Sequence, residues 1–178
     1  AYYNMGAALQ KQNQLEESLA AYEKSLSLNP QNAEVYNNMG IVLSEQGKLD
    51  KSLAAYEKAL SLNPQNAELH YNMGITLQKQ RKLEEAVNSY KKTLLLNPNY
   101  GEAYNNMGNA LKDQSKLVEA IIAYEKALSL NPDNADVRSQ KLHQQAHICD
   151  WSSIDKDRSY FNNLGIIGDA VTPLSMLS

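Results

Sequence analysis

The stretch "VYNNMGIVLSEQGKLDKSLAAYEKALSLNP", residues 35–64, carries apolar residues at helical spacing in two segments separated by the short polar turn "QGK". The "NP" that closes it returns every 34 residues without an insertion, together with a glycine and a tyrosine. The recurring residues are Gly6, Gly40, Gly74 and Gly108; Tyr22, Tyr56, Tyr90 and Tyr124; and Pro30, Pro64, Pro98 and Pro132. A helix hairpin repeated at a fixed period predicts an α-solenoid, in which each unit packs on its neighbours.

Asparagine and proline mark the ends of the predicted helices. Asn32, Asn66 and Asn134 stand where an N-cap is expected, each followed by alanine and an acidic residue that suits the positive end of a helix. A proline inside a helix costs about 3 kcal/mol, so each "NP" ends the helix before it. The third junction, "NPNYGE", differs because Tyr100 takes the cap position.

The second unit resembles the tetratricopeptide repeat. It matches that family's motif at Tyr36, Met39, Gly40, Leu43, Ser52, Tyr56, Ala59 and Pro64. The resemblance extends over four units, residues 1–33, 34–67, 68–101 and 102–135, and implies a right-handed superhelix whose first helices line a concave groove. We therefore expect an all-α fold, with a capping helix over residues 136–150 and a short helix and tail over 151–178.

Gly40 falls on the buried stripe of its helix, within about 100° of arc that also holds Tyr36 and Met39. The residues expected opposite the repeat glycines are small: Ser18, Ser52, Ala86 and Ala120. The pairing predicts a close approach of the two helix backbones. That packing would offset the helix propensity lost at glycine, about 1 kcal/mol.

Asn38 lies about 200° from Tyr36 on the same helical wheel, which places it on the surface that the resemblance assigns to the groove. An amide there offers both the donor and the acceptor that an extended peptide backbone needs. The predicted peptide-binding residues are Asn4, Asn38, Asn72, Asn106, Asn37, Asn105, Asn109, Ile41 and Ile75. The alternative is that duplication copied an asparagine without function. Neighbouring positions vary along the array while the asparagine does not, which favours binding.

Composition is typical of a protein-binding chain. Seventeen basic and 20 acidic residues give a net charge of -3, with no long run of either sign, which argues against nucleic acid or a membrane as partner. The single Cys149 and the absence of a signal-peptide pattern predict an intracellular location, cytoplasmic or nuclear. The sequence has no glycine-rich phosphate loop, and we expect no cofactor. Because the chain opens inside a repeat, Tyr2, Met5 and Leu9 on the first helix offer a route to self-association.

Two other kinds of site are less favoured by the sequence. A clamp for acidic peptide tails would need basic residues in the groove, where Glu34, Glu68 and Glu102 are expected instead. His143, His147 and Cys149 could place two imidazoles on one helical face, but the set lacks a fourth metal ligand. We expect ordinary capping-helix residues there, no metal, and a buried anchor at Trp151.

The segment "ICDW", residues 148–151, followed by "TPLSML", residues 172–177, resembles the junction of protein O-linked N-acetylglucosamine transferases and SPINDLY-type O-fucosyltransferases. In that family the asparagine two residues before the repeat glycine holds substrate backbones, which the resemblance carries to Asn4, Asn38, Asn72 and Asn106. It implies a substrate-recognition region that is not itself an enzyme, since the catalytic domain would follow residue 178. The alternative is a general scaffold that assembles protein complexes.

Overall fold

The computed structural model describes residues 1–149, and every regular element in that range is an α-helix. The helices are α1 (Tyr2–Lys11), α2 (Leu15–Leu28), α3 (Ala33–Glu45), α4 (Leu49–Leu62), α5 (Ala67–Lys79), α6 (Leu83–Leu96), α7 (Gly101–Asp113), α8 (Leu117–Leu130) and α9 (Ala135–His147). The predicted all-α architecture of helix hairpins is confirmed. The short helix and the buried Trp151 that the sequence predicts for the tail lie outside the described residues.

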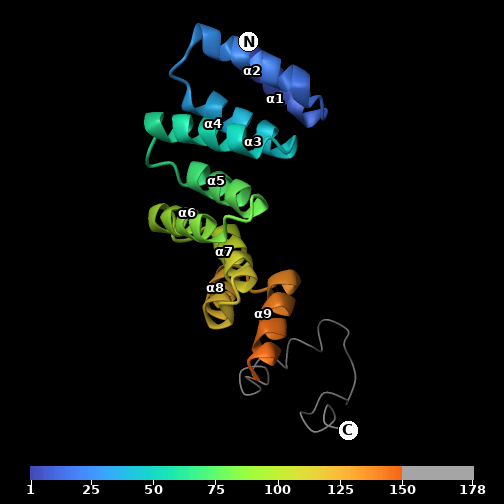
Figure 1. The fold of residues 1–178 in the computed structure, drawn as a ribbon, viewed down its shortest axis with the longest axis vertical. Coiled ribbons are helices and arrows are strands. Elements are labelled where there is room, and N and C mark those ends of the chain that lie inside the picture. The colour runs from blue at the N-terminus through green and yellow to red at the C-terminus, as the bar shows by residue number, and fades with distance from the viewer. Residues whose placement is uncertain (150–178) are drawn as a thin grey trace.

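The hairpins stack along one long axis, with α1 at one end and α9 at the other (Figure 1). The two helices of each hairpin pack on each other, and the second helix also contacts the first helix of the next hairpin. The first helices α1, α3, α5 and α7 contact one another in sequence, which forms one continuous wall. Helix α9 packs against α8 and so covers the last hairpin.

Side-chain caps begin the helices at the predicted asparagines. The Asn32 Oδ1 accepts hydrogen bonds from the backbone N–H groups of Glu34 (3.1 Å) and Val35 (3.3 Å), and Asn66 repeats this arrangement at the start of α5. Asn134 caps α9 with a single bond, accepted from the Val137 N–H at 3.1 Å, whereas Tyr100 before α7 makes no side-chain cap hydrogen bond. The third junction therefore lacks a stabilising contact that the second, the first and the last junctions have.

The core of each hairpin is a tyrosine ring against a glycine. Tyr22, Tyr56, Tyr90 and Tyr124 have at most 1% of their surface exposed. A Cβ atom added to Gly40 or Gly74 would lie 2.5 or 2.6 Å from the Cε1 atom of the facing tyrosine. The glycine is thus required by the aromatic ring, and not mainly by the small residue opposite it. The small residue has a separate contact, because the Ser52 hydroxyl donates to the Gly40 carbonyl at 2.6 Å.

A left-handed residue ends each turn between the two helices of a hairpin. Asn13, Gly47, Arg81 and Ser115 have φ of 58°, 74°, 63° and 62°, at the 34-residue period. Cys149 continues this series with φ of 58°. Helix α9 therefore ends as a first helix of the array does, although its sequence has departed from the repeat.

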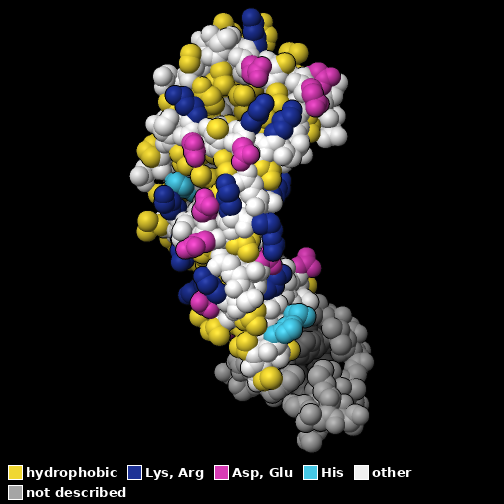
Figure 2. All heavy atoms as spheres, viewed as in Figure 1, with side chains coloured by type: hydrophobic (Ala, Val, Ile, Leu, Met, Phe, Trp, Pro, Cys, Tyr) yellow, Lys and Arg dark blue, Asp and Glu magenta, His cyan; other side chains and the backbone are white. Residues whose placement is uncertain are grey.

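The surface mixes charges of both signs. Figure 2 shows lysine and arginine side chains interspersed with aspartate and glutamate over the face in view. Within residues 1–149, no helix combines the length and apolar character needed to cross a lipid bilayer.

Candidate groove site

The asparagine row lies on the wall formed by α1, α3, α5 and α7, and its members differ in exposure. Asn4 is exposed, whereas Asn38, Asn72 and Asn106 are half-buried. The neighbouring Asn37 is buried, with 8% of its surface exposed. The expectation of a purely exposed row therefore needs correction for every member except the first.

Asn38, Asn72 and Asn106 are partly buried where they form hydrogen bonds to the preceding hairpin. In each of three cases the asparagine amide nitrogen donates to the residue 35 positions earlier, on the preceding first helix. The pairs are Asn38 Nδ2 to Tyr3 Oη (3.3 Å), Asn72 Nδ2 to Asn37 Oδ1 (3.1 Å) and Asn106 Nδ2 to Tyr71 Oη (3.1 Å). The row thus has a structural role that a helical wheel of one hairpin does not predict, since the wheel contains no information about the next hairpin.

The amide oxygens of these three asparagines have no hydrogen-bond partner among the described residues. No donor in residues 1–149 bonds the Oδ1 atom of Asn38, Asn72 or Asn106, and none of the three is among the buried oxygens that lack a partner. The three oxygens are therefore accessible to solvent. Because each amide nitrogen is fixed by its bond, each oxygen is held in one orientation as a hydrogen-bond acceptor.

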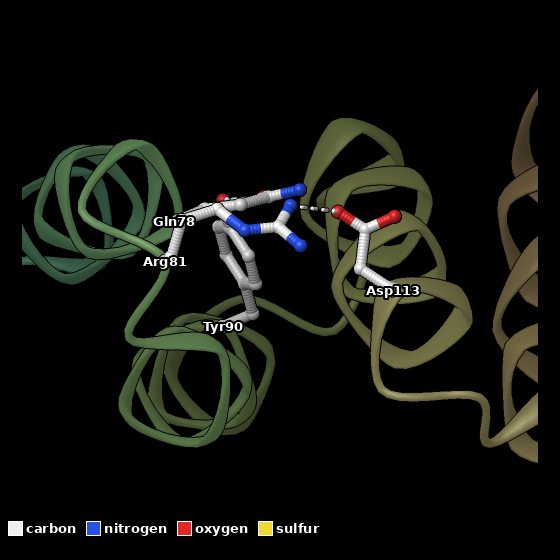
Figure 3. Close-up of polar contacts among 4 residues, drawn as sticks. All are labelled: Gln78, Arg81, Tyr90 and Asp113. Atoms are coloured by element: carbon white, nitrogen blue, oxygen red, sulfur yellow. Dashed lines mark hydrogen bonds and ion pairs between the residues drawn. The ribbon is translucent and has the colours of Figure 1, made fainter.

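A cavity of about 460 Å³ lies along the wall between α5 and α7. It is lined by Ile75, Gln78, Lys79, Arg81, Tyr90, Asn106 and Asp113, which include two of the predicted residues. The Tyr90 hydroxyl reaches its edge and donates to Gln78 Oε1 at 3.0 Å, and the Arg81 guanidinium pairs with Asp113 at 3.1 Å across the two helices (Figure 3). Burial of the Tyr90 ring raises the pKa of its hydroxyl, which keeps it neutral and available as a donor.

The remaining predicted residues contribute to packing as well as to the wall. Ile41 packs against the core around Tyr56, as Ile75 does against the core around Tyr90. The Asn109 Oδ1 accepts from the Tyr124 hydroxyl at 2.9 Å. In the third hairpin the acceptor for the tyrosine hydroxyl is Gln78, and the equivalent position in the fourth hairpin is Lys112. Asn109 therefore takes the role of that glutamine for Tyr124.

Asn37 and Asn105 occupy equivalent positions with different surroundings. Asn37 also lines a polar cavity of about 490 Å³ at the starts of α3 and α5, together with Glu34 and Glu68. The Oδ1 of Asn105 is buried and has no partner among the described residues. Gln140, which stands 35 positions after Asn105 as Asn72 does after Asn37, has a buried amide oxygen that also lacks a partner there.

Sequence reasoning missed the residues that support the row. Tyr3, Asn37 and Tyr71 each precede a row asparagine by one position, and each accepts from the asparagine of the next hairpin. Their signal in the sequence is an alternation of tyrosine and asparagine at one repeat position. That alternation gains meaning only when the 35-residue register between hairpins is known.

The two histidines of α9 lie close to each other. The rings of His143 and His147 have centroids 4.7 Å apart and are tilted by 55°. Residues 1–149 contain no group of three histidine, cysteine, aspartate or glutamate side chains that could hold a metal ion. Cys149 is an exposed free thiol.

A stack of helix hairpins with tyrosine–glycine cores and an amide-lined wall defines an α-solenoid of the protein-binding class. Two family models match it: one described as TPR repeat over residues 6–47 and 42–81, and one described as Tetratricopeptide repeat over 67–100 and 101–134. The chain belongs to the tetratricopeptide-repeat family.

Solved structures show the same fold. The chain is similar to YrrB, described as a TPR protein with an unusual peptide-binding site, at 28% identity and a TM-score of 0.70, with 82% of this chain and 75% of that chain covered. The first TPR of Spaghetti (RPAP3), bound to the HSP90 peptide SRMEEVD, is also 28% identical, with a TM-score of 0.65 and coverage of 67% and 94%. MamA from Desulfovibrio magneticus RS-1 is 21% identical with a TM-score of 0.83, covering 94% and 95%. The comparison with curated proteins returned no significant match.

Proposed function

We propose that the wall of first helices binds an extended polypeptide and that the chain acts as a protein-interaction scaffold. The observation that carries this proposal is the row of oriented amide oxygens on Asn38, Asn72 and Asn106. An extended backbone offers N–H donors at regular intervals, whatever its side chains are. Acceptors fixed along a solenoid would therefore recognise the backbone of many sequences.

Two of the similar proteins support this use of the fold. YrrB is described as having a peptide-binding site, and the first TPR of RPAP3 was solved with a bound peptide. That peptide, SRMEEVD, is acidic. We do not expect this chain to prefer such a ligand, because the exposed carboxylates Glu34, Glu68 and Glu102 stand in the first turns of α3, α5 and α7.

A narrower proposal is that the bound polypeptide is the acceptor of a protein O-glycosyltransferase. It rests on the segment "ICDW" and the tail after it, most of which lies outside the described residues. None of the solved structures named above is described as a transferase, so the scaffold function has the broader support. Two α/β lobes encoded after residue 178 would favour the transferase, and a stop codon there would exclude it.

The binding test replaces Asn38, Asn72 and Asn106 together by alanine and measures fluorescence anisotropy with an extended, Ser/Thr-rich peptide. Each net hydrogen bond is worth about 0.5 to 1.5 kcal/mol, so we expect the affinity to fall by about tenfold or more. Each substitution also removes a bond between hairpins and gains helix propensity, so stability should fall by less than about 1 kcal/mol per site.

A matched control separates binding from stability. The double variant Tyr3→Phe/Tyr71→Phe removes the acceptors for Asn38 and Asn106 but keeps both asparagine oxygens. We expect a comparable loss of stability and a clearly smaller loss of binding than in the triple variant, because the oxygens remain but are no longer held in one orientation. Equal losses of binding in both variants would show that the oxygens themselves do not contact the peptide, and unchanged binding in the triple variant would refute the proposal.

A further inference from the structure

The junction between the third and fourth hairpins carries two tyrosines that no other junction combines. The rings of Tyr71 and Tyr100 lie with centroids 4.7 Å apart and an interplanar angle of 31°. Tyr71 belongs to the supporting residues of the asparagine row, since its hydroxyl accepts from Asn106. Both tyrosines are half-buried.

Tyr100 occupies its position at a cost to the fold. The equivalent residues Asn32, Asn66 and Asn134 cap the helices that follow them, whereas Tyr100 makes no cap hydrogen bond. A missing asparagine cap costs about 1 kcal/mol. A residue that breaks a local rule of the array, without a cap to compensate, is typical of a functional position.

Two carboxylates lie at the starts of the helices that hold the ring pair, because Tyr71 belongs to α5 and Tyr100 directly precedes α7. Glu68 and Glu102, in the first turns of α5 and α7, are exposed and form no side-chain hydrogen bond or ion pair within residues 1–149. Burial raises the pKa of Tyr100 to about 12, and the charges of Glu68 and Glu102 contribute to the rise. Burial also raises the pKa of Tyr71, with a further contribution from Glu102.

The local charge favours a cation. Each helix N-terminus carries a partial charge of about +0.5, so the starts of α5 and α7 together contribute about +1. Two carboxylates outweigh that contribution and leave the junction negative. An aromatic face attracts a cation through its quadrupole, and a guanidinium adds planar stacking and paired hydrogen bonds to carboxylate.

The first junction provides an internal comparison. Tyr3 is the counterpart of Tyr71, but its hydroxyl donates to Glu34, and the residue in the place of Tyr100 is the capping Asn32. There the carboxylate is already engaged and the second ring is absent. The arrangement at the third junction is therefore not a general consequence of the repeat.

We propose that Tyr71, Tyr100, Glu68 and Glu102 form a subsite for an arginine side chain of the polypeptide bound along the wall. The inference rests on the proposed peptide-binding function and adds a side-chain preference to it. Backbone acceptors alone would bind many sequences equally, whereas this subsite would select those with an arginine in register with the junction.

The test compares two labelled Gly/Ser/Thr nonapeptides that differ only at the central residue, which is arginine or its neutral isostere citrulline. Cation–π contacts are worth about 0.5 to 2 kcal/mol, so we expect the arginine peptide to bind about 2- to 30-fold more tightly in anisotropy measurements. Tyr100→Asn, which restores the cap of the other junctions, and Glu102→Gln should each reduce this ratio to near one. Glu34→Gln, at the first junction, should leave it unchanged.

Outcomes for the subsite and for the groove are distinguishable. A wild-type ratio near one, or a ratio that survives Tyr100→Asn, overturns the subsite while binding of the citrulline peptide still supports the groove. If neither peptide binds, the proposed function fails. The subsite is then tested separately, by adding N-acetyl-arginine amide to the protein. That probe should then shift the Tyr71 and Tyr100 ring signals in NMR spectra of the wild type but not of Glu102→Gln, and the absence of a shift refutes the subsite.

Discussion

Replacing Gly74 by alanine tests the contact on which every hairpin depends. A Cβ at this position would lie 2.6 Å from Tyr90 Cε1, 2.9 Å from Cδ1 and 3.1 Å from Cζ. The ring has no free direction in which to move, because Tyr90 is fully buried and its hydroxyl is bonded to Gln78. Elsewhere in a helix the same substitution would be favourable by about 1 kcal/mol.

The expected loss follows from three contributions. Overpacking a core by one methyl group costs about 1 to 3 kcal/mol, and displacement of the Tyr90 hydroxyl would weaken a hydrogen bond worth about 1 kcal/mol. The gain in helix propensity offsets about 1 kcal/mol of this. We therefore expect the free energy of unfolding, measured by urea denaturation with far-UV circular dichroism, to fall by about 1 to 3 kcal/mol.

Two companion variants identify the cause. Gly101 also lies in a helix, but a Cβ added there would have Leu130 Cβ as its nearest neighbour, at 3.9 Å. Gly101→Ala should therefore leave stability unchanged or raise it. In a Tyr90→Leu background, Gly74→Ala should lose its cost, giving a coupling of about 1 to 3 kcal/mol in the double-mutant cycle. A Gly74→Ala protein as stable as the wild type, or additive effects in the cycle, would refute the account of the core.

Three further predictions use other parts of the array. Asn66→Ala removes the α5 cap and should lower the free energy of unfolding by about 1 kcal/mol, measured by urea denaturation, with Asn32→Ala showing a similar loss. Gly47→Ala, at φ of 74° with no atom within 4 Å of an added Cβ, should cost about 1 kcal/mol through the backbone alone, and replacement of Ser115 by glycine should not destabilise. Burial raises the pKa of Tyr56 and of Tyr124 to about 12, above the ordinary value near 10. The contribution of the two neutral hydroxyls to stability is therefore complete below pH 10 and is lost as the pH rises toward 12. Absorbance at 295 nm should show both tyrosines ionising together with unfolding.

The sequence predicted the hairpins because their signals are local. The caps at Asn32, Asn66 and Asn134, and the missing cap at Tyr100, follow from the preference of asparagine for helix starts and are confirmed. The burial of Gly40 was also predicted, but its direct neighbour proved to be the Tyr56 ring. A helical wheel gives the direction of each side chain and not its length, so it could not show which residue of the second helix reaches the glycine.

The asparagine row shows where local reasoning stops. The helical wheel placed Asn72 outside the buried stripe, and in the structure the Asn72 amide oxygen is accessible to solvent. The bond from its amide nitrogen to Asn37 depends on how far one hairpin is displaced along the next, which no single hairpin encodes. The binding role of the row stays a prediction. The bond to the preceding hairpin adds to it the orientation of the amide oxygen that would contact a peptide.

The two ends of the wall indicate that its structural unit is a pair of hairpins. The residue before the row asparagine alternates as Tyr3, Asn37, Tyr71 and Asn105, and the last residue of each first helix alternates in charge as Lys11, Glu45, Lys79 and Asp113. This alternation of charge keeps like charges from facing each other on adjacent first helices. It also allows a lysine at the end of one first helix to contact the preceding hairpin, as Lys79 Nζ does when it donates to Ser44 Oγ at 3.0 Å. The alternation of tyrosine and asparagine means that tyrosine hydroxyls support Asn38 and Asn106, whereas an amide supports Asn72. A polypeptide on this wall would therefore meet the same supporting residue only at every second hairpin. The third junction differs from the first as well, because Tyr100 stands in the place of the capping Asn32. The proposed side-chain subsite is therefore confined to one junction, whereas the proposed backbone acceptors Asn38, Asn72 and Asn106 lie at three.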